Sequence, residues 1–166
     1  DKCSSQGPVQ GTGVKQPAPA VPDAGQSAAR EHRGCCSASD AADARFDDEA
    51  FALQGKQKIG AMWRMLCEAV EAKGRDVWQL ELSQVTEHSA HWEPTYRFSA
   101  TGRMVHNIID AEFEFNAAGQ ITGQRDRFDF WRWSRQALGT PGLLLGWSPL
   151  LRNKVRAQAA KNLERF

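Results

Sequence analysis

The sequence predicts one α+β domain in which helices pack against a curved antiparallel sheet. Three observations predict this class: an apolar helical period over 56–73, alternating apolar and polar residues over 78–131, and a second helical period over 149–165. Short turns join the alternating segments, which is typical of antiparallel strands with helices collected on one face. The chain of 166 residues is 41% hydrophobic and 25% charged, which is a composition typical of a globular protein.

The chain divides into two regions near residue 40. Residues 1–45 contain no Leu, Ile, Met, Phe, Trp or Tyr, and Pro, Gly, Ser, Ala and Gln fill much of this stretch. Such a segment cannot bury enough apolar surface to offset the entropy of ordering it. All six Trp and all eight Phe come from Phe46 onward. We therefore expect a tail without regular structure over 1–40 and a folded domain over 41–166.

The near-neutral charge and the lack of long apolar runs exclude two classes of partner. The formal net charge is +1, whereas a dedicated nucleic-acid binder usually carries a strong basic excess. No run approaches the roughly 18 apolar residues that a transmembrane helix needs. The first residues form no apolar signal-peptide core. We therefore expect a cytoplasmic protein with neither a nucleic-acid nor a membrane partner.

The cysteines, histidines and glycines match no cofactor motif. The four cysteines fit no zinc spacing. His88 and His91 are three residues apart in a segment predicted as strand and turn, so they would not share a strand face. The sequence also lacks a GxGxxG or P-loop motif and a GxSxG elbow. We predict no metal and no cofactor.

The first folded element is a helix over 56–73. The residues of its apolar face follow one another at helical spacing: Ile59, Met62, Trp63, Leu66 and Val70. Four strands follow, near 78–83, near 92–98, over 103–115 and over 120–131. Pro94 marks an edge, an end or a bulge in the second strand, and residues 116–119 form a hairpin loop. A short helical turn is expected to end near Gly139.

The last element is a helix over 149–165. Ser148 is the predicted N-cap and Pro149 occupies the first helical position. Apolar residues recur every four positions from Leu151, and arginines and lysines lie on the other sides. This pattern predicts a packing helix with a solvated basic face, with a membrane-surface or partner-docking helix as the alternative.

Polar residues interrupt two of the predicted apolar strand faces. Asp126 shares strand parity with Phe128 and Phe130, and Asn107 shares it with Val105 and Ile109. A buried carboxylate is costly unless it is paired, hydrogen-bonded or neutralised. Two interpretations stay open: this face lines a cavity, or Asp126 pairs with a neighbouring arginine while Asn107 bonds a strand edge.

A third polar group lies just after Phe46, where Asp47, Asp48 and Glu49 form a loop or strand end by composition. They form either a solvated turn or a general base at the mouth of a pocket. The six tryptophans are expected mainly in the core, with one or two lining a ligand pocket.

From Ala42 to Phe166 the chain resembles the SnoaL-like branch of the nuclear transport factor 2-like superfamily, within a bacterial subgroup. The resemblance rests on the order and spacing of six segments. They are ARFDD at 44–48, QGK at 54–56, IIDAEFEF at 108–115, NAAGQI at 116–121, RDRFD at 125–129 and FWRWSRQALG at 130–139.

This resemblance implies a cone of curved antiparallel sheet, closed by helices around an apolar pocket, and a homodimer. The superfamily includes steroid isomerases, polyketide cyclases, limonene-epoxide-type hydrolases and binding proteins without known chemistry. Asp48 falls where the isomerases and some cyclases place a base. Asp126 falls where the epoxide hydrolases place an acid/base aspartate.

The chain departs from each of these mechanisms. Trp92, Glu93 and Pro94 stand where the epoxide hydrolases carry an Arg-x-Asp pair, and Ala111 stands where the isomerases place a second acid. The tyrosine donor of the isomerases' first helix has no counterpart. The superfamily also begins with two helices, whereas the residues before Ala42 show no helical period. We therefore expect those helices to be missing or replaced, for example through a frameshift.

The sequence as a whole predicts a protein with a pocket for a small apolar molecule. If it is an enzyme, it is a hydrolase, isomerase or cyclase with Asp48 and Asp126 as paired general acid and base, without metal or nucleotide. The predicted pocket residues are Trp63, Trp92, Tyr96, Asn107, Phe113 and Phe128. The alternatives are a non-catalytic ligand-binding or dimerisation module of the same fold and a protein-interaction domain that uses the outer sheet face and the basic last helix.

Overall fold

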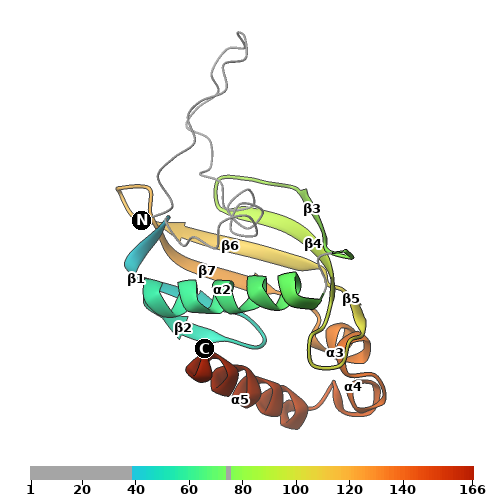
Figure 1. Cartoon of the computed structure of the whole chain (residues 1–166). Helices are drawn as coiled ribbons and strands as arrows, with labels where there is room; N and C mark the ends of the chain where they lie inside the picture. Colours follow the sequence, from blue (N-terminus) through green and yellow to red (C-terminus); the bar gives the residue numbers. More distant parts are fainter. Residues whose placement is uncertain (1–38, 74–75) are drawn as a thin grey trace.

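A computed structural model describes residues 39–73 and 76–166, where a curved mixed sheet of seven strands packs with four helices (Figure 1). The strands are β1 (Asp40–Asp47), β2 (Ala52–Gln54), β3 (Gln79–Ser83), β4 (Ser89–Arg97), β5 (Met104–His106), β6 (Ile109–Phe115) and β7 (Ile121–Arg127). The helices are α2 (Lys56–Lys73), α3 (Phe130–Leu138), α4 (Thr140–Leu145) and α5 (Pro149–Arg165). The α+β class with a curved sheet is thereby confirmed.

The sheet runs in the order β2-β1-β7-β6-β4-β3, and β5 pairs with β4 beside β6. Every pair is antiparallel except β1 and β7, which run parallel. The sheet is therefore mixed rather than purely antiparallel. The sequence did not predict β1 as a strand because a register shift between Asp40 and Arg45 breaks the alternation of buried residues.

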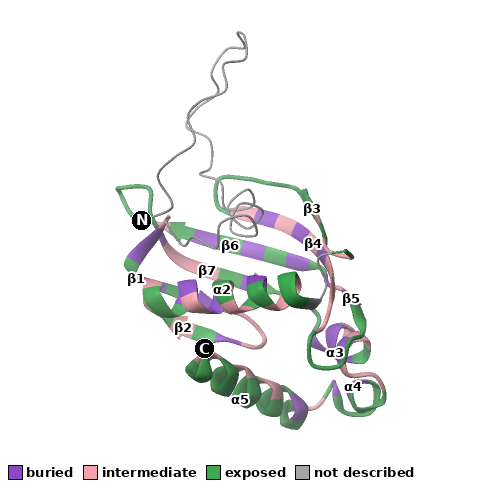
Figure 2. Ribbon diagram, viewed as in Figure 1, coloured by how far each residue is buried: buried purple, intermediate pink, exposed green. Residues whose placement is uncertain are grey.

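Helix α2 has the predicted bounds and packs its apolar face on the sheet. Ile59 and Met62 are buried against Ala44 and Phe46 of β1, and Trp63 contacts the same cluster. Helix α5 also has the predicted bounds, with Ser148 Oγ accepting a hydrogen bond from Leu150 N at 3.1 Å. Figure 2 shows that α5 is exposed over most of its length beyond Leu151.

The predicted third strand is split into β5 and β6. The break falls at Asn107 and Ile108, where Asn107 N donates to the Pro94 carbonyl at 3.0 Å. Pro94 itself lies inside a continuous β4, at the point where the partner of β4 changes from β6 to β5. Pro94 has no N–H to donate, so of its two backbone groups only the carbonyl takes part in this contact.

The predicted fourth strand ends earlier than expected, at Arg127. Asp129 caps α3, accepting a hydrogen bond from Arg132 N at 3.0 Å, so Phe130 begins a helix and does not share a strand face with Phe128. The turn expected near Gly139 is the end of α3, and α4 follows without having been predicted.

The expected tail and the missing or replaced N-terminal helices fall mainly on residues 1–38, outside the described residues. Within residues 39–73 and 76–166, no helix is long and apolar enough to cross a membrane.

Candidate functional site

An apolar cavity of about 230 Å³ lies between the sheet and helices α2 and α3. Its apolar wall includes Phe46, Phe51, Met62, Trp63, Trp92, Ile109, Phe128, Phe130 and Trp133. Polar residues also line the cavity, among them Asp48, Tyr96, Asn107 and Asp126. A largely apolar cavity with a few convergent polar groups is the usual form of a small-molecule site.

Asp126 is the most deeply buried carboxyl of this wall. It lies on β7, opposite Ala111 of β6, with 4% of its surface exposed. Gln124 Nε2 donates to Asp126 Oδ1 at 2.9 Å, and no other described group hydrogen-bonds this carboxyl. Burial raises the pKa of Asp126 to about 7, the Gln124 bond opposes the rise, and the charge of Asp48 adds to it. Asp126 can therefore hold a proton near neutral pH.

Asp48 lies in the loop between β1 and β2 and is half-buried. Its Oδ1 accepts two backbone hydrogen bonds, from Ala50 N at 2.6 Å and Phe51 N at 2.5 Å. Burial raises the pKa of Asp48 to about 6, although these two bonds stabilise the carboxylate. Asp48 is therefore ionised at neutral pH, and among the described residues its Oδ2 accepts no bond.

The register of two parallel strands brings these carboxyls together. Phe46 pairs with Gln124 and Asp47 with Arg125, so one further step along the register sets Asp48 beside Asp126. Neighbouring strands lie about 4.8 Å apart. At this separation the charge of Asp48 adds to the rise that burial causes in the pKa of Asp126.

Tyr96 of β4 supplies a hydroxyl on the same wall. Its oxygen accepts a hydrogen bond from Trp133 Nε1 at 3.0 Å, which leaves the O–H proton free to be donated into the cavity. Burial raises the pKa of Tyr96 to about 12, so the hydroxyl stays protonated. Trp133 of α3 thus orients a hydrogen-bond donor of the sheet.

Asn107 carries an amide that is unsatisfied among the described residues. The residue is 5% exposed, lines the cavity and donates its backbone N–H to Pro94, but no hydrogen bond joins its side chain to residues 39–73 or 76–166. Leaving a buried amide unpaired costs about 1–3 kcal/mol. A ligand atom or a water in the cavity would satisfy it.

Seven of the eight predicted site residues line this one cavity, and Phe113 does not. Phe113 is buried farther along β6, in a cluster with Ala90, Ile121 and Ala111. The alternative pairing of Asp126 with a neighbouring arginine is not seen: Arg127 forms an ion pair with Glu112 at 3.3 Å instead.

Sequence reasoning missed several wall residues. Met62 was predicted on the apolar face of α2 but not in the pocket. Its position next to Trp63, a predicted pocket residue, could have indicated that it lines the cavity. Phe130 and Trp133 line the wall from α3, and Phe130 had been predicted as part of a strand. Among the described residues, no group of three or more His, Cys, Asp or Glu side chains could hold a metal ion.

Comparisons with known proteins show solved structures with a similar fold. No family model and no curated protein matches the sequence. A Rhodopseudomonas palustris protein provisionally described as an isomerase gives a TM-score of 0.53 at 14% identity, over 69% of this chain and 94% of its own. A Mycobacterium tuberculosis epoxide hydrolase of the LEH-like type gives 0.45 at 17% identity, over 78% and 89%. A Catenulispora acidiphila protein with a ketosteroid isomerase-like fold, solved with trimethylamine, gives 0.47 at 13% identity, over 64% and 81%. At these identities the likeness concerns the fold alone.

Proposed function

From the cone fold that this chain shares with the nuclear transport factor 2-like superfamily, we propose that the protein binds a compact, largely apolar molecule and moves a proton on it. The observation that carries the proposal is the pair of carboxyls on one apolar cavity wall, Asp48 and Asp126, with pKa values raised to about 6 and about 7. Such a pair divides the roles of base and acid near neutral pH.

The free carboxylate oxygen of Asp48 acts as the general base in this proposal. Its other oxygen is fixed by two backbone N–H groups, so the base is oriented without being neutralised. Asp126, protonated over a larger part of the pH range, acts as the acid. Tyr96 donates a further hydrogen bond, to a carbonyl or enolate oxygen of the ligand.

The size of the cavity limits the ligand. A cavity of roughly 150 Å³ accommodates benzene, and this cavity measures about 230 Å³. A single substituted ring fits this volume. The buried Asn107 amide and the Tyr96 hydroxyl support a ligand with at least one hydrogen-bonding oxygen.

Proton shuttling in an isomerisation or cyclisation fits these contacts better than epoxide hydrolysis. Glu93, which stands within the segment matching the hydrolases' Arg-x-Asp pair, faces the other side of the sheet, where it contacts His91 and His106. Trp92 and Pro94 on either side of Glu93 line the cavity and carry no charge. The segment that matches the Arg-x-Asp pair therefore presents no charged group to the cavity.

The test is hydrogen–deuterium exchange into small cyclic ketones and enones, followed by NMR in D₂O. The wild type should exchange the proton next to the carbonyl, and Asp48→Asn should reduce the rate by about 100-fold or more, as expected for loss of a general base. Asp126→Asn should also abolish turnover while the protein stays folded. Asp43→Asn is the matched control, because Asp43 lies exposed on β1. Undiminished exchange in Asp126→Asn would reject its role.

A second candidate is a non-catalytic ligand-binding or dimerisation module. Ala111 in place of a second acid favours it, because the residue opposite Asp126 carries no polar group. Exposed apolar side chains on and after α4 support a homodimer: Leu143, Leu144, Leu145, Trp147 and Leu150. Ligands that raise the melting temperature but never exchange, together with a dimer mass by light scattering, would favour this module over the enzyme.

A further inference from the structure

A second, open pocket of about 640 Å³ borders α3 on the side away from the apolar cavity. Its lining residues come from α3, from the start of β5 and from the residue before β5: Arg103, Met104, Arg132, Arg135 and Gln136. Phe130 and Trp133 of α3 line the apolar cavity. At 3.6 residues per turn these two sets lie on opposite faces of the helix. The two pockets are therefore separate sites that share one helix.

Neutral groups hold the three arginines of this pocket. Arg103 Nε donates to the Gln136 carbonyl at 2.7 Å, and its guanidinium packs so closely on Gly139 that a Cβ there would lie 3.3 Å from it. The guanidinium of Arg135 lies over the ring of Trp131, 4.8 Å from the centroid. Arg132 donates to His106 Nδ1 at 3.4 Å. Each arginine is thus positioned without losing its charge.

Gln136 fixes the two walls of the pocket to each other. Its Oε1 accepts from His106 N at 2.9 Å, and its Nε2 donates to the His106 carbonyl at 3.1 Å. This pair of bonds ties α3 to β5. The arginines therefore project from a rigid frame, which reduces the entropy lost on binding a ligand.

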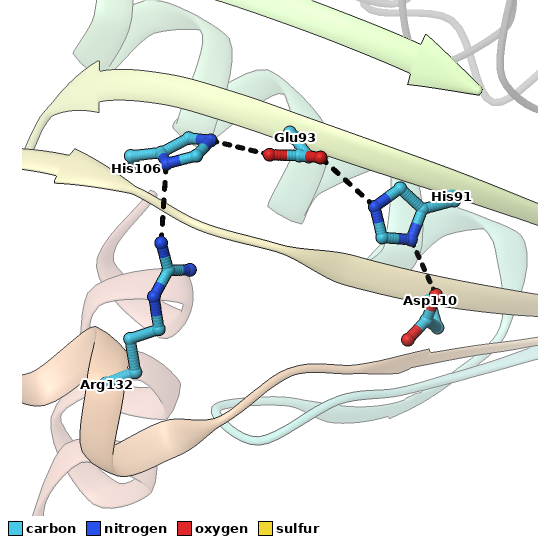
Figure 3. A network of polar contacts seen from close by, with 5 residues as sticks. All are labelled: His91, Glu93, His106, Asp110 and Arg132. Atoms are coloured by element: carbon cyan, nitrogen blue, oxygen red, sulfur yellow. Dashed lines mark hydrogen bonds and ion pairs between the residues drawn. The ribbon is translucent and has the colours of Figure 1, made fainter.

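The His106 ring lies between Arg132 and the carboxylate of Glu93 (Figure 3). A guanidinium can only donate, so His106 Nδ1 accepts and its Nε2 carries the proton that Glu93 Oε2 receives at 2.8 Å. Glu93 also contacts His91 Nε2 at 3.2 Å, and His91 Nδ1 lies 2.7 Å from Asp110 Oδ1. The negative charge of Glu93 is therefore directed at the two histidines.

Within the described part of the chain, no carboxylate forms an ion pair with Arg103, Arg132 or Arg135. Three like charges around one pocket repel each other, and a bound anion removes that repulsion. The planar guanidinium fork matches the oxygens of phosphate, which is why arginine is common in phosphate sites. We propose that Arg103, Arg132 and Arg135 form a binding site for a phosphate-type oxyanion.

The experiment is a titration of the full chain with inorganic phosphate, followed by calorimetry and by the NMR signals of the arginine Nε–H groups. Arg135→Gln is the principal variant, because the Arg135 guanidinium lies over the Trp131 ring and, among the described residues, its side chain forms no hydrogen bond that the substitution would remove. Arg135→Gln and Arg132→Gln should each weaken phosphate binding by about tenfold, the effect of one charged hydrogen bond. Arg64→Gln and Arg125→Gln are the controls: both residues are exposed, and both substitutions change the net charge equally.

A second arm distinguishes the source of the phosphate group. Sedimentation with vesicles of phosphatidylcholine, with and without phosphatidylglycerol, tests a lipid headgroup. Phosphate binding that the two variants lose and the controls keep supports a free phosphate compound as the ligand. Binding only to anionic vesicles, with the same pattern among variants, supports a headgroup. If neither probe binds, or if the controls weaken binding as much as Arg135→Gln does, the proposal is overturned.

Discussion

At the scale of single residues, the site depends on two polar groups that the fold buries without full compensation. Asp126 has one hydrogen bond, from Gln124, and Asn107 has none from its side chain among the described residues. Both arrangements cost stability relative to an apolar residue of similar shape. A ligand that forms a hydrogen bond with such a group recovers part of this lost stability. The two residues therefore define the candidate site.

The Asp126 carboxyl gives a prediction about stability and pH. Its pKa is about 7 when folded, against an ordinary value of 3.8, so the folded state binds the extra proton between about pH 4 and 7. Stability should therefore fall as the pH rises through this window. Asp126→Asn mimics the protonated acid and keeps an acceptor for Gln124. Above pH 7 it should be more stable than the wild type by up to about 4 kcal/mol, the free energy of the shift.

Urea unfolding of both proteins at acid and alkaline pH measures this difference. The two free energies of unfolding should converge below pH 4, where both side chains are neutral in both states. A difference independent of pH would mean that Asp126 is not buried as an acid. The control is Asp43→Asn, an exposed position where no such trend is expected.

The sequence was informative about these residues for a physical reason. Strand parity placed Asp126 and Asn107 on an apolar face, and the resemblance added a role for Asp126. Phe113 shows the limit of that argument, because parity gives the face of a strand but not the position along it. The missing hydrogen bonds of the Asn107 amide could not be predicted either, because they depend on which polar groups of β4 and α3 lie within reach of it.

At the scale of elements, those whose own residues carry a helical period and a cap could be predicted, and those held by long-range contacts could not. Helices α2 and α5 carry their own period, and Ser148 caps α5, so their bounds are encoded within each segment. Strand β1 is held by long-range pairing with β7, and its Ala- and Asp-rich sequence has low strand propensity. Helix α3 begins at Phe130, directly after its cap Asp129. Residues 126, 128 and 130 still alternate as in a strand, and this chance alternation extended the predicted strand too far.

The contact between α3 and α4 gives a prediction at this scale. Gly142 of α4 lies so close to α3 that a Cβ would meet the Ser134 carbonyl oxygen at 1.9 Å. Backbone cannot move aside as a side chain can, so Gly142→Ala should destabilise the protein by about 3 kcal/mol or more. The control is Gly123→Ala in β7, where the three nearest atoms to the added Cβ belong to the Glu114 side chain and the closest is its movable carboxylate oxygen. Thermal unfolding should show a large loss for the first variant and a small one for the second.

At the scale of the whole molecule, the last helix is tied to the loop that holds the proposed base. Arg156 of α5 donates to the Glu49 carbonyl at 3.0 Å and to the Asp48 carbonyl at 2.8 Å. Arg152 adds an ion pair with Glu49 at 3.2 Å. These contacts span more than 100 residues of sequence and connect the basic face of α5 to the cavity wall. The charges that the sequence predicted as solvated therefore include two that position the 48–51 loop.

This link predicts that Arg156 contributes to the pKa of Asp48 from outside the cavity. The positive charge of Arg156 lowers the pKa of Asp48 against the rise that burial causes. Arg156→Gln should therefore move the Asp48 midpoint upward from about 6 and cost about 1 kcal/mol of stability through the two lost hydrogen bonds. An NMR titration of the aspartate carboxyl carbons measures the midpoint. Arg165→Gln, at the far end of the same helix, carries the same charge change and should leave it in place. An Asp48 midpoint that stays the same in both variants would mean that the loop is held by its own turn, through the N–H groups of Ala50 and Phe51, and not by the C-terminal helix.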